Sequence, residues 1–327
     1  MALKLVLFSV VGFALLIGGM KLTEAALTRW AGNRLASWLQ TATSTPLRGF
    51  LFGTAASASL QSSTAVTVLT IGFVNAGWID FSRSFGIILG TNVGTTLTTE
   101  IMSLQLHRYG WALLAAAFTG WLWTAVKAEM GTNGAAPRGS LVPLRYGSVA
   151  LAGFGFLLIG FEILLGMGSV LQQSDLFVSL MDTAADHPLV GLLGGAALTA
   201  IVHSSSAVIG MGMAAAGTGA MSPEAGIAVV LGANVGTCFT GLVASLGGGP
   251  GGRFVALTQL ALNVAGALLF LPLMPLLQGA AAMLSPGDPS AQIAHAQTIF
   301  NAACSIAALP LAYWPWRSKR GPGVYST

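Results

Sequence analysis

The chain carries one structural unit twice, and this duplication constrains its fold more than any other feature. Residues 47–104 align without a gap to residues 189–246 at an offset of 142 positions, and twenty of the 58 aligned positions are identical. The identities include the run Gly-x-Asn-Val-Gly-Thr and two pairs of serines, Ser62-Ser63 and Ser204-Ser205. Chance similarity between apolar segments does not readily match polar residues in one register. We therefore expect two copies of one supersecondary unit.

Charged residues are too scarce for a water-soluble surface. Asp, Glu, Lys and Arg make up 7% of the chain, whereas roughly a quarter is usual in soluble domains. The sequence therefore predicts an all-α, multi-pass membrane protein and argues against a soluble enzyme, a disordered chain and a nucleic-acid binder. The N-terminal apolar run reaches toward Leu27 without a clear cleavage site, which favours a first span at about 3–27 over a signal peptide.

The placement of the charges predicts that the two copies are inverted in the membrane. The segment after the first span carries only basic residues and its counterpart carries only acidic ones: Arg29, Arg34 and Arg48 against Asp175, Asp182 and Asp186. Because basic residues mark the cytoplasmic side, the two equivalent segments belong on opposite faces. The resulting topology has seven spans and two re-entrant hairpins in a cell inner membrane. Its N-terminus is outside and its C-terminus is cytoplasmic.

These patterns divide the chain into four parts. The first inverted repeat is 1–127, with a hairpin at 47–79 and a broken helix at 82–103. A polar cytoplasmic linker follows at 128–146. The second inverted repeat is 147–283, with a hairpin at 189–221 and a broken helix at 224–246. An extra helix and a basic cytoplasmic tail occupy 284–327, and the tail contains Arg317, Lys319 and Arg320.

Each hairpin carries polar residues at its tip, between apolar runs that are too short to cross a membrane. The first tip is Gln61-Ser62-Ser63-Thr64 and the second is His203-Ser204-Ser205-Ser206. Backbone can leave the helical form at membrane depth only where it lines a cavity. The helix N-terminus at such a break binds anions without a Lys or Arg, and the hydroxyl groups can serve an oxyanion or a hard cation.

The run Gly90–Thr96 predicts a second interruption, because its glycines permit unwinding and its Asn and Thr side chains offer oxygen atoms. Paired interrupted helices in two inverted halves are typical of the midplane site of a transporter. The alternative is structural, since Ser and Thr often bond their own helix and Gly allows close helix packing. The occurrence of both motifs in two copies favours a binding site.

Other polar residues in apolar runs are less informative. Glu100 is expected to be solvated near a helix end, and Glu162 is either a structural partner or a gate. Lys21 and Glu24, at i,i+3, are expected to form an interfacial pair. We find no metal-ligand cluster, nucleotide loop or catalytic triad in the sequence, and His203 has no buried Asp placed nearby. The sequence therefore predicts a protein that is not an enzyme and has no cofactor.

With these motifs in two inverted halves, the chain resembles the type II sodium-dependent phosphate cotransporters and their bacterial relatives over about 3–126 and 147–277. The resemblance implies sodium-coupled uptake of inorganic phosphate by alternating access, with an elevator-like movement and a homodimer in some relatives. It implies phosphate binding by Gln61, Ser62, Ser63, Thr64, His203, Ser204, Ser205 and Ser206. It implies sodium binding, with Na+ as the coupling ion, by Ser63, Thr64, Asn92, Thr95, Ser205, Ser206, Asn234 and Thr237.

The chain departs from the family pattern in three respects. His203 stands where the family has Gln, and histidine can titrate near neutrality. The family's His before Phe-Asn corresponds here to Gln259 with Asn263 and to Gln297 with Asn301. The sequence contains neither the disulfide-bearing loop of animal members nor the regulatory domain of many bacterial ones, so we expect a minimal prokaryotic member.

Several functions remain open at this level. The protein could carry another oxyanion or a small carboxylate, or its transport could be driven by protons. An anion channel is less favoured, because a continuous pore should show rings of charge or of carbonyl groups. If the serines serve only helix packing, replacing Ser62 and Ser204 by Ala should leave transport unchanged.

Overall fold

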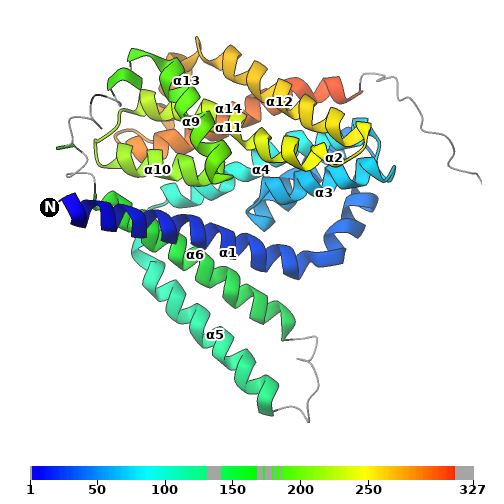
Figure 1. Cartoon of the computed structure of the whole chain (residues 1–327), viewed down its shortest axis with the longest axis horizontal. Helices are drawn as coiled ribbons and strands as arrows, with labels where there is room; N and C mark the ends of the chain where they lie inside the picture. The colour runs from blue at the N-terminus through cyan, green and yellow to red at the C-terminus, as the bar shows by residue number, and fades with distance from the viewer. Residues whose placement is uncertain are drawn as a thin grey trace, which may run out of the picture.

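The described part of the chain consists of helices joined by turns and contains no strand, as the sequence predicts. The computed structural model describes residues 2–130, 141–167, 172–173, 179, 182–184 and 186–313. Its helices are α1 (Ala2–Ala42), α2 (Pro46–Leu60), α3 (Ser63–Asn75), α4 (Phe81–Ser103), α5 (Gly110–Met130), α6 (Val142–Leu165), α9 (Pro188–Val202), α10 (Ser205–Gly217), α11 (Pro223–Leu246), α12 (Pro250–Phe270), α13 (Met274–Leu284) and α14 (Pro289–Ala308). Two short 3-10 helices cover Leu106–Tyr109 and Leu309–Tyr313. Figure 1 shows their arrangement.

The duplication in sequence recurs as a duplication in structure. Helices α9 and α10 have the bounds of α2 and α3 shifted by 142 residues, and α11 begins at the same offset from α4. Both α2 and α9 begin with a proline, which fits the first helical turn because its N–H group would lack a partner there in any case. The two copies therefore build the same three-helix unit from locally equivalent signals.

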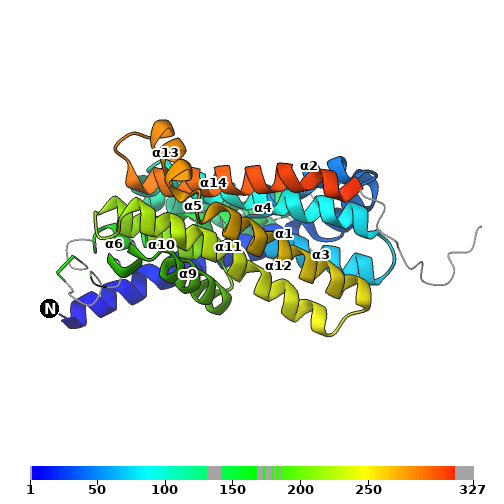
Figure 2. The same ribbon diagram turned by 90° about the horizontal axis from the view of Figure 1, so that it is seen from above.

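The two hairpins approach the middle of the molecule from opposite ends. In Figure 1, α2 and α3 lie on the right and α9 and α10 on the left. Helix α14 lies along α4 and α11 between them, as Figure 2 shows from above. Helices α1 and α6 pack against each other beside this group, and α5 packs on the outside of α6. The central core joins these parts through Leu16, Phe161, Met213, Val230 and Ile293, all fully or almost fully buried.

Helix α1 is longer than expected. The sequence predicts a span at about 3–27 followed by a polar stretch, but one helix continues to Ala42. No proline occurs before Pro46, so nothing in this stretch forces the helix to end earlier. Its apolar part, Leu7–Ala31, is one of four described segments long and apolar enough to cross a membrane, together with α6, α11 and α12.

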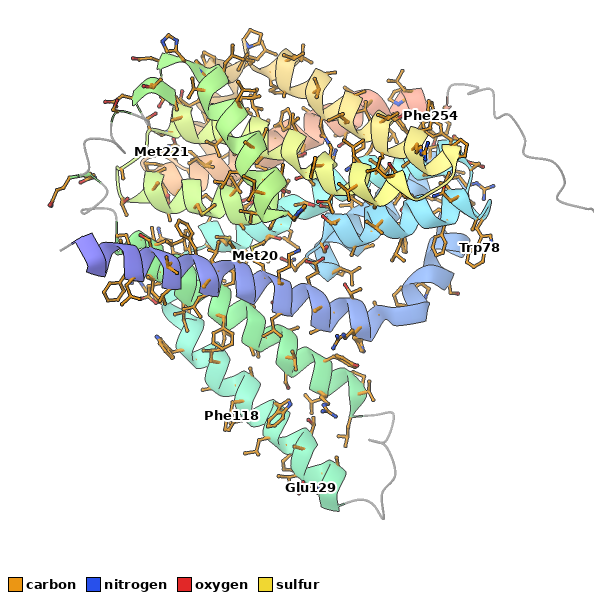
Figure 3. All side chains as sticks on the ribbon, viewed as in Figure 1. Met20, Trp78, Phe118, Glu129, Met221 and Phe254 are labelled. Carbon is orange, nitrogen blue, oxygen red and sulfur yellow. The ribbon has the colours of Figure 1, made fainter. Side chains whose placement is uncertain are left out.

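The predicted number of seven spans remains a prediction. Helices α4, α5 and α14 have 23, 21 and 20 residues, which is long enough for a crossing. The exposed face of α5 carries large apolar side chains, including Trp111, Trp123 and Phe118, and Figure 3 labels the last of these. Such a face is compatible with lipid.

The predicted breaks in 82–103 and 224–246 are wrong, because α4 and α11 are continuous helices. Their glycines serve close packing against the first helix of each unit. A Cβ added at Gly90 would lie 2.0 Å from the carbonyl oxygen of Phe50, and one added at Gly232 would lie 1.8 Å from that of Leu192. Helices can approach this closely only where no side chain intervenes.

Two threonines of these helices form hydrogen bonds within their own helix, as the structural alternative expects. Thr95 Oγ1 donates to the carbonyl oxygen of Thr91 at 2.8 Å, and Thr237 Oγ1 donates to that of Ala233 at 3.0 Å. Hydroxyl groups bonded to their own helix in this way do not require an unwound backbone. The motif therefore lies on an intact helix in both copies.

The linker and the C-terminal part differ from the expected bounds. Helices α5 and α6 take up both ends of the predicted linker 128–146, and residues 131–140 lie outside the described residues. Helix α14 is the predicted extra helix, whereas the basic tail with Arg317, Lys319 and Arg320 lies outside the described residues. The expected span at 253–277 ends at Phe270, because Pro272 has no N–H group to continue the helix, and α13 follows as a separate helix.

Candidate functional site

The turn at each hairpin tip has the same unusual backbone. Gln61 ends α2 in the left-handed region at φ 54° and ψ 31°, and His203 ends α9 at φ 57° and ψ 31°. Residues other than glycine rarely adopt this backbone conformation, which costs them roughly 1–2 kcal/mol. The next residue is extended in both turns and caps the following helix. Ser62 Oγ accepts from the N–H of Ala65 at 3.1 Å, and Ser204 Oγ accepts from that of Ala207 at 3.3 Å.

The first residue of each tip is tied to the third helix of its own unit. Thr98 Oγ1 donates to Gln61 Oε1 at 2.7 Å. His203 Nδ1 lies 3.0 Å from Thr240 Oγ1, and Thr240 is the counterpart of Thr98 at the offset of 142. The replacement of glutamine by histidine therefore preserves a side-chain bond between the tip and α11. This bond supports the left-handed turn that it adjoins.

The two tips meet at one cavity beside α1. Its empty space is about 390 Å³, including its opening. It is lined by Gln61, Ser62, Ser63, Thr64, His203, Ser204, Ser205, Ser206, Thr95, Thr237, Met20, Lys21 and Glu24. All eight predicted tip residues are thus brought together, although 142 residues separate the two sets. Helices α3 and α10 both begin at this cavity, so both positive helix ends lie at it.

Two predicted sodium ligands do not line this cavity. Asn92 Nδ2 donates to Asn263 Oδ1 at 3.3 Å, and Asn263 Nδ2 donates to Cys238 Sγ at 3.0 Å. Asn234 Nδ2 donates to the carbonyl oxygen of Val230 at 2.8 Å. The amide of Asn92 therefore connects α4 to α12, and that of Asn234 bonds its own helix.

The contribution of α1 to the cavity was not predicted from the sequence. Lys21 and Glu24 form the expected pair, with Nζ and Oε2 2.9 Å apart, but the pair lines the cavity and is not merely interfacial. Glu24 Oε1 also accepts from Ser62 Oγ at 2.6 Å. Both residues lie inside the apolar span Leu7–Ala31, where charged groups are costly and usually functional. A charged pair inside an apolar span was therefore the sequence signal that could have identified these residues as part of the site. Figure 3 labels the neighbouring Met20 where α1 passes the hairpin tips.

Glu100 is not simply solvated, contrary to expectation. Its Oε2 lies 3.0 Å from His295 Nδ1, and its Oε1 accepts from Thr298 Oγ1 at 2.5 Å. These contacts tie α4 to α14 and lie away from the cavity lining. Glu162 has an exposed side chain on α6 and is also outside the lining. Neither carboxylate therefore belongs to the candidate site.

A second cavity, between α1 and α6, has a different character. Apolar side chains make up most of its lining, together with Arg29, Arg145 and Tyr146, and it shares no residue with the first cavity. The first cavity combines hydroxyl groups, two helix N-termini and one ion pair among apolar helices. This combination is typical of membrane transporters of small ions, since such carriers bind their cargo at helix ends near the midplane.

The chain matches the sequence model of the Na+/Pi-cotransporter family twice, over residues 15–167 and 165–285, and it belongs to this family. One match falls in each half, in keeping with the duplication. Membership indicates a transporter and not an enzyme, with phosphate and sodium as the ions named by the family.

Three relatives illustrate the range of similarity. The chain is 33% identical over 299 residues to the "Uncharacterized protein YqeW" of Bacillus subtilis, covering 90% of this chain and 91% of that protein. It is 26% identical over 298 residues to the "Putative inorganic phosphate export protein YjbB" of Escherichia coli O157:H7, covering 91% of this chain and 52% of that protein. It is 33% identical over 62 residues to the "Sodium-dependent phosphate transport protein 2A" of Ovis aries, covering 19% of this chain and 10% of that protein.

The chain thus spans about half the length of the matched Escherichia coli protein. No solved structure matches it.

Proposed function

We propose that this protein is a secondary active transporter that couples the uptake of inorganic phosphate to sodium. One observation carries the proposal: the polar tips of two hairpins, distant in sequence, meet at a single cavity where two helices begin. The family supplies the identity of the ions. Sodium is the coupling ion, and no other cofactor is needed.

Phosphate suits the donors at the tips. A phosphate ion has several acceptor oxygens, and the cavity offers hydroxyl groups and the first N–H groups of α3 and α10. The proposed phosphate ligands are Gln61, Ser62, Ser63, Thr64, His203, Ser204, Ser205 and Ser206. Sodium prefers oxygen atoms, which Ser63, Thr64, Thr95, Ser205, Ser206 and Thr237 supply. Asn92 and Asn234 are supporting residues in this proposal, because neither lines the cavity and their amides bond to other groups.

The proposed transport cycle uses the inverted repeats. The hairpins enter from opposite faces of the inner membrane, with the N-terminus outside and the C-terminus in the cytoplasm. The hairpin units move in an elevator-like manner against α1, α5 and α6. The opposed approach of the two hairpins in Figure 1 supports this proposal, as does the exposed apolar face of α5, which is suited to contact with lipid. The proposal includes a homodimer only because the chain resembles the type II sodium-dependent phosphate cotransporters, some of which are dimers.

Phosphate export is a second candidate, favoured by the name of the YjbB relatives. The two directions differ in one measurable respect. A sodium-coupled importer accumulates phosphate on the side toward which sodium flows, whereas an exporter accumulates it on the side from which sodium enters or needs no sodium.

The test is uptake of radiolabelled phosphate into proteoliposomes under an inward sodium gradient, with potassium as the control. We expect sodium-dependent uptake that falls at least tenfold in Ser62→Ala and in Ser204→Ala, because each loses a donor and a helix cap. Thr119→Ala is the matched control, since this exposed hydroxyl bonds its own helix on α5, away from the cavity.

Other results would change the proposal. Equal uptake in potassium would remove sodium coupling and direct attention to protons and His203. Correctly inserted protein without phosphate uptake under either gradient would contradict the substrate. Full activity in both serine variants would assign the tips to helix packing.

A further inference from the structure

The hydroxyl group of Ser62 already donates a hydrogen bond to a carboxylate of the protein itself, that of Glu24. Ser62 Oγ uses one lone pair to accept from the N–H of Ala65, which leaves its proton free to donate. It donates that proton to Glu24 Oε1 at 2.6 Å, a length typical of a hydroxyl bonded to an ionised carboxylate. The carboxylate thus lies at the tip of the first hairpin, where α3 begins.

The same carboxylate is paired with the cation of the cavity. Glu24 Oε2 lies 2.9 Å from Lys21 Nζ. Lys21 is the one Lys or Arg among the residues that line the cavity. The two side chains are 46% and 22% exposed, so an ion that enters the cavity can reach them. Glu24 therefore lies between the positive charge and the hydrogen-bond donor that an anionic cargo would use.

Among the residues that the structure describes, the second copy has no such carboxylate. Ser204 has the same backbone conformation and the same cap as Ser62. However, the positions that correspond to Lys21 and Glu24 are Ile163, near the end of α6, and Gly166, which caps that helix. No described carboxylate accepts from Ser204. The two tips, otherwise equivalent, thus differ in whether an internal anion is bound to the serine.

We propose that Glu24 is an internal competitor of the anionic substrate. On this proposal, which rests on the proposed function, phosphate displaces Glu24 from Ser62 and takes over its ion pair with Lys21. The ammonium group of lysine is a compact charge with three rotatable donors, so it can pair with either anion. Glu24 is then left without its cation. A sodium ion can replace Lys21 at the carboxylate, and this exchange links sodium binding to phosphate binding.

The test measures binding of radiolabelled phosphate to the purified full chain in lipid nanodiscs, over a series of sodium concentrations. In Glu24→Gln the amide oxygen can still accept from Ser62, but it no longer holds Lys21. We expect binding about tenfold tighter at low sodium, the usual scale for one charge-assisted contact, and a weaker dependence on sodium. Lys21→Gln should bind about tenfold more weakly. Glu162→Gln is the matched control, because this carboxylate lies in α6 outside the cavity.

If Glu24→Gln does not fold, a second variant still tests the proposal. Glu24→Asp keeps the charge but shortens the side chain, so it should release Ser62 and change affinity in the same direction as Glu24→Gln. Retained folding is checked by size-exclusion chromatography and circular dichroism. Weaker or unchanged phosphate binding in the folded Glu24 variants would overturn the proposal.

The outcomes separate this proposal from the proposed function. Wild-type protein that binds phosphate, with Glu24→Gln no tighter, contradicts only the competition. Wild-type protein and Glu24→Gln that both fail to bind phosphate contradict the substrate as well. Tighter binding in Glu24→Gln together with weaker binding in Lys21→Gln supports both.

Discussion

Position 203 holds histidine where the other copy has glutamine, yet both side chains reach a threonine on the third helix of their unit. The bonds are Thr98 Oγ1 to Gln61 Oε1 and His203 Nδ1 to Thr240 Oγ1, at 2.7 and 3.0 Å. Both residues also hold a left-handed backbone. The role common to the two positions is therefore to fix the tip relative to the long helix behind it.

This role predicts an order among substitutions of His203. Glutamine can make the same bond that Gln61 makes, whereas alanine leaves Thr240 without its partner. We expect the initial rate of phosphate uptake in His203→Ala to be about fivefold below that in His203→Gln, the scale of one lost hydrogen bond. The measurement is uptake into proteoliposomes with equal amounts of inserted protein. Equal rates in the two variants would show that the bond to Thr240 does not matter.

Much of the candidate site could be predicted from local sequence, and the remainder could not. The tips stand out because polar residues interrupt apolar runs, and duplication pairs them. The part played by Lys21 and Glu24 depends on where α1 passes the hairpins, which no local pattern specifies. Glu100 illustrates the same limit, since its partner His295 lies 195 residues away.

At the scale of the element, the glycines of α4 and α11 fix the distance between helices. Added Cβ atoms at Gly90 and Gly232 would collide with carbonyl oxygens of α2 and α9. The same residues suggested a break from sequence, because glycine permits both unwinding and close packing. Sequence cannot separate these uses, since the difference lies in the neighbouring helix. The helix bounds themselves were predictable from the prolines and serines that begin α2, α3, α9 and α10.

This packing predicts a difference between two glycines of the second unit. Gly232→Ala places a methyl group against the backbone of α9, and overpacking of this kind costs about 1–3 kcal/mol. Gly194→Ala is the matched control, because an added Cβ there meets nothing within 4 Å. We expect a lower Tm only for Gly232→Ala, measured by thermal unfolding in detergent. Equal Tm values would mean that α9 can shift to make room.

At the scale of the whole molecule, two equal units approach one cavity from opposite ends. If the units are inverted in the membrane, equivalent turns must lie on opposite faces. The turns after α3 and α10 provide such a pair, at Ala76 and Thr218. In the proposed orientation the turn of the first unit is cytoplasmic, because basic residues lie near that unit.

This topology predicts the labelling of two single cysteines, with Cys238 and Cys304 replaced by alanine. Thr218→Cys should react with a membrane-impermeant maleimide added to intact cells, whereas Ala76→Cys should react only after the membrane is opened. Reaction of both cysteines in intact cells, or the reverse pattern, would contradict the proposed inversion or its orientation.

The pairing of Lys21 with Glu24 also has an electrical consequence. The Lys and Glu side chains that line the cavity carry one positive and one negative charge, which cancel. Moving a unit charge through a membrane potential of 100 mV takes about 2.3 kcal/mol of work. The pair adds nothing to this work, because its charges are balanced and both lie on α1, against which the hairpin units are proposed to move. The voltage felt by the transport cycle is therefore set by the ions that the cavity carries, so a current measured during transport would count the net charge of the cargo.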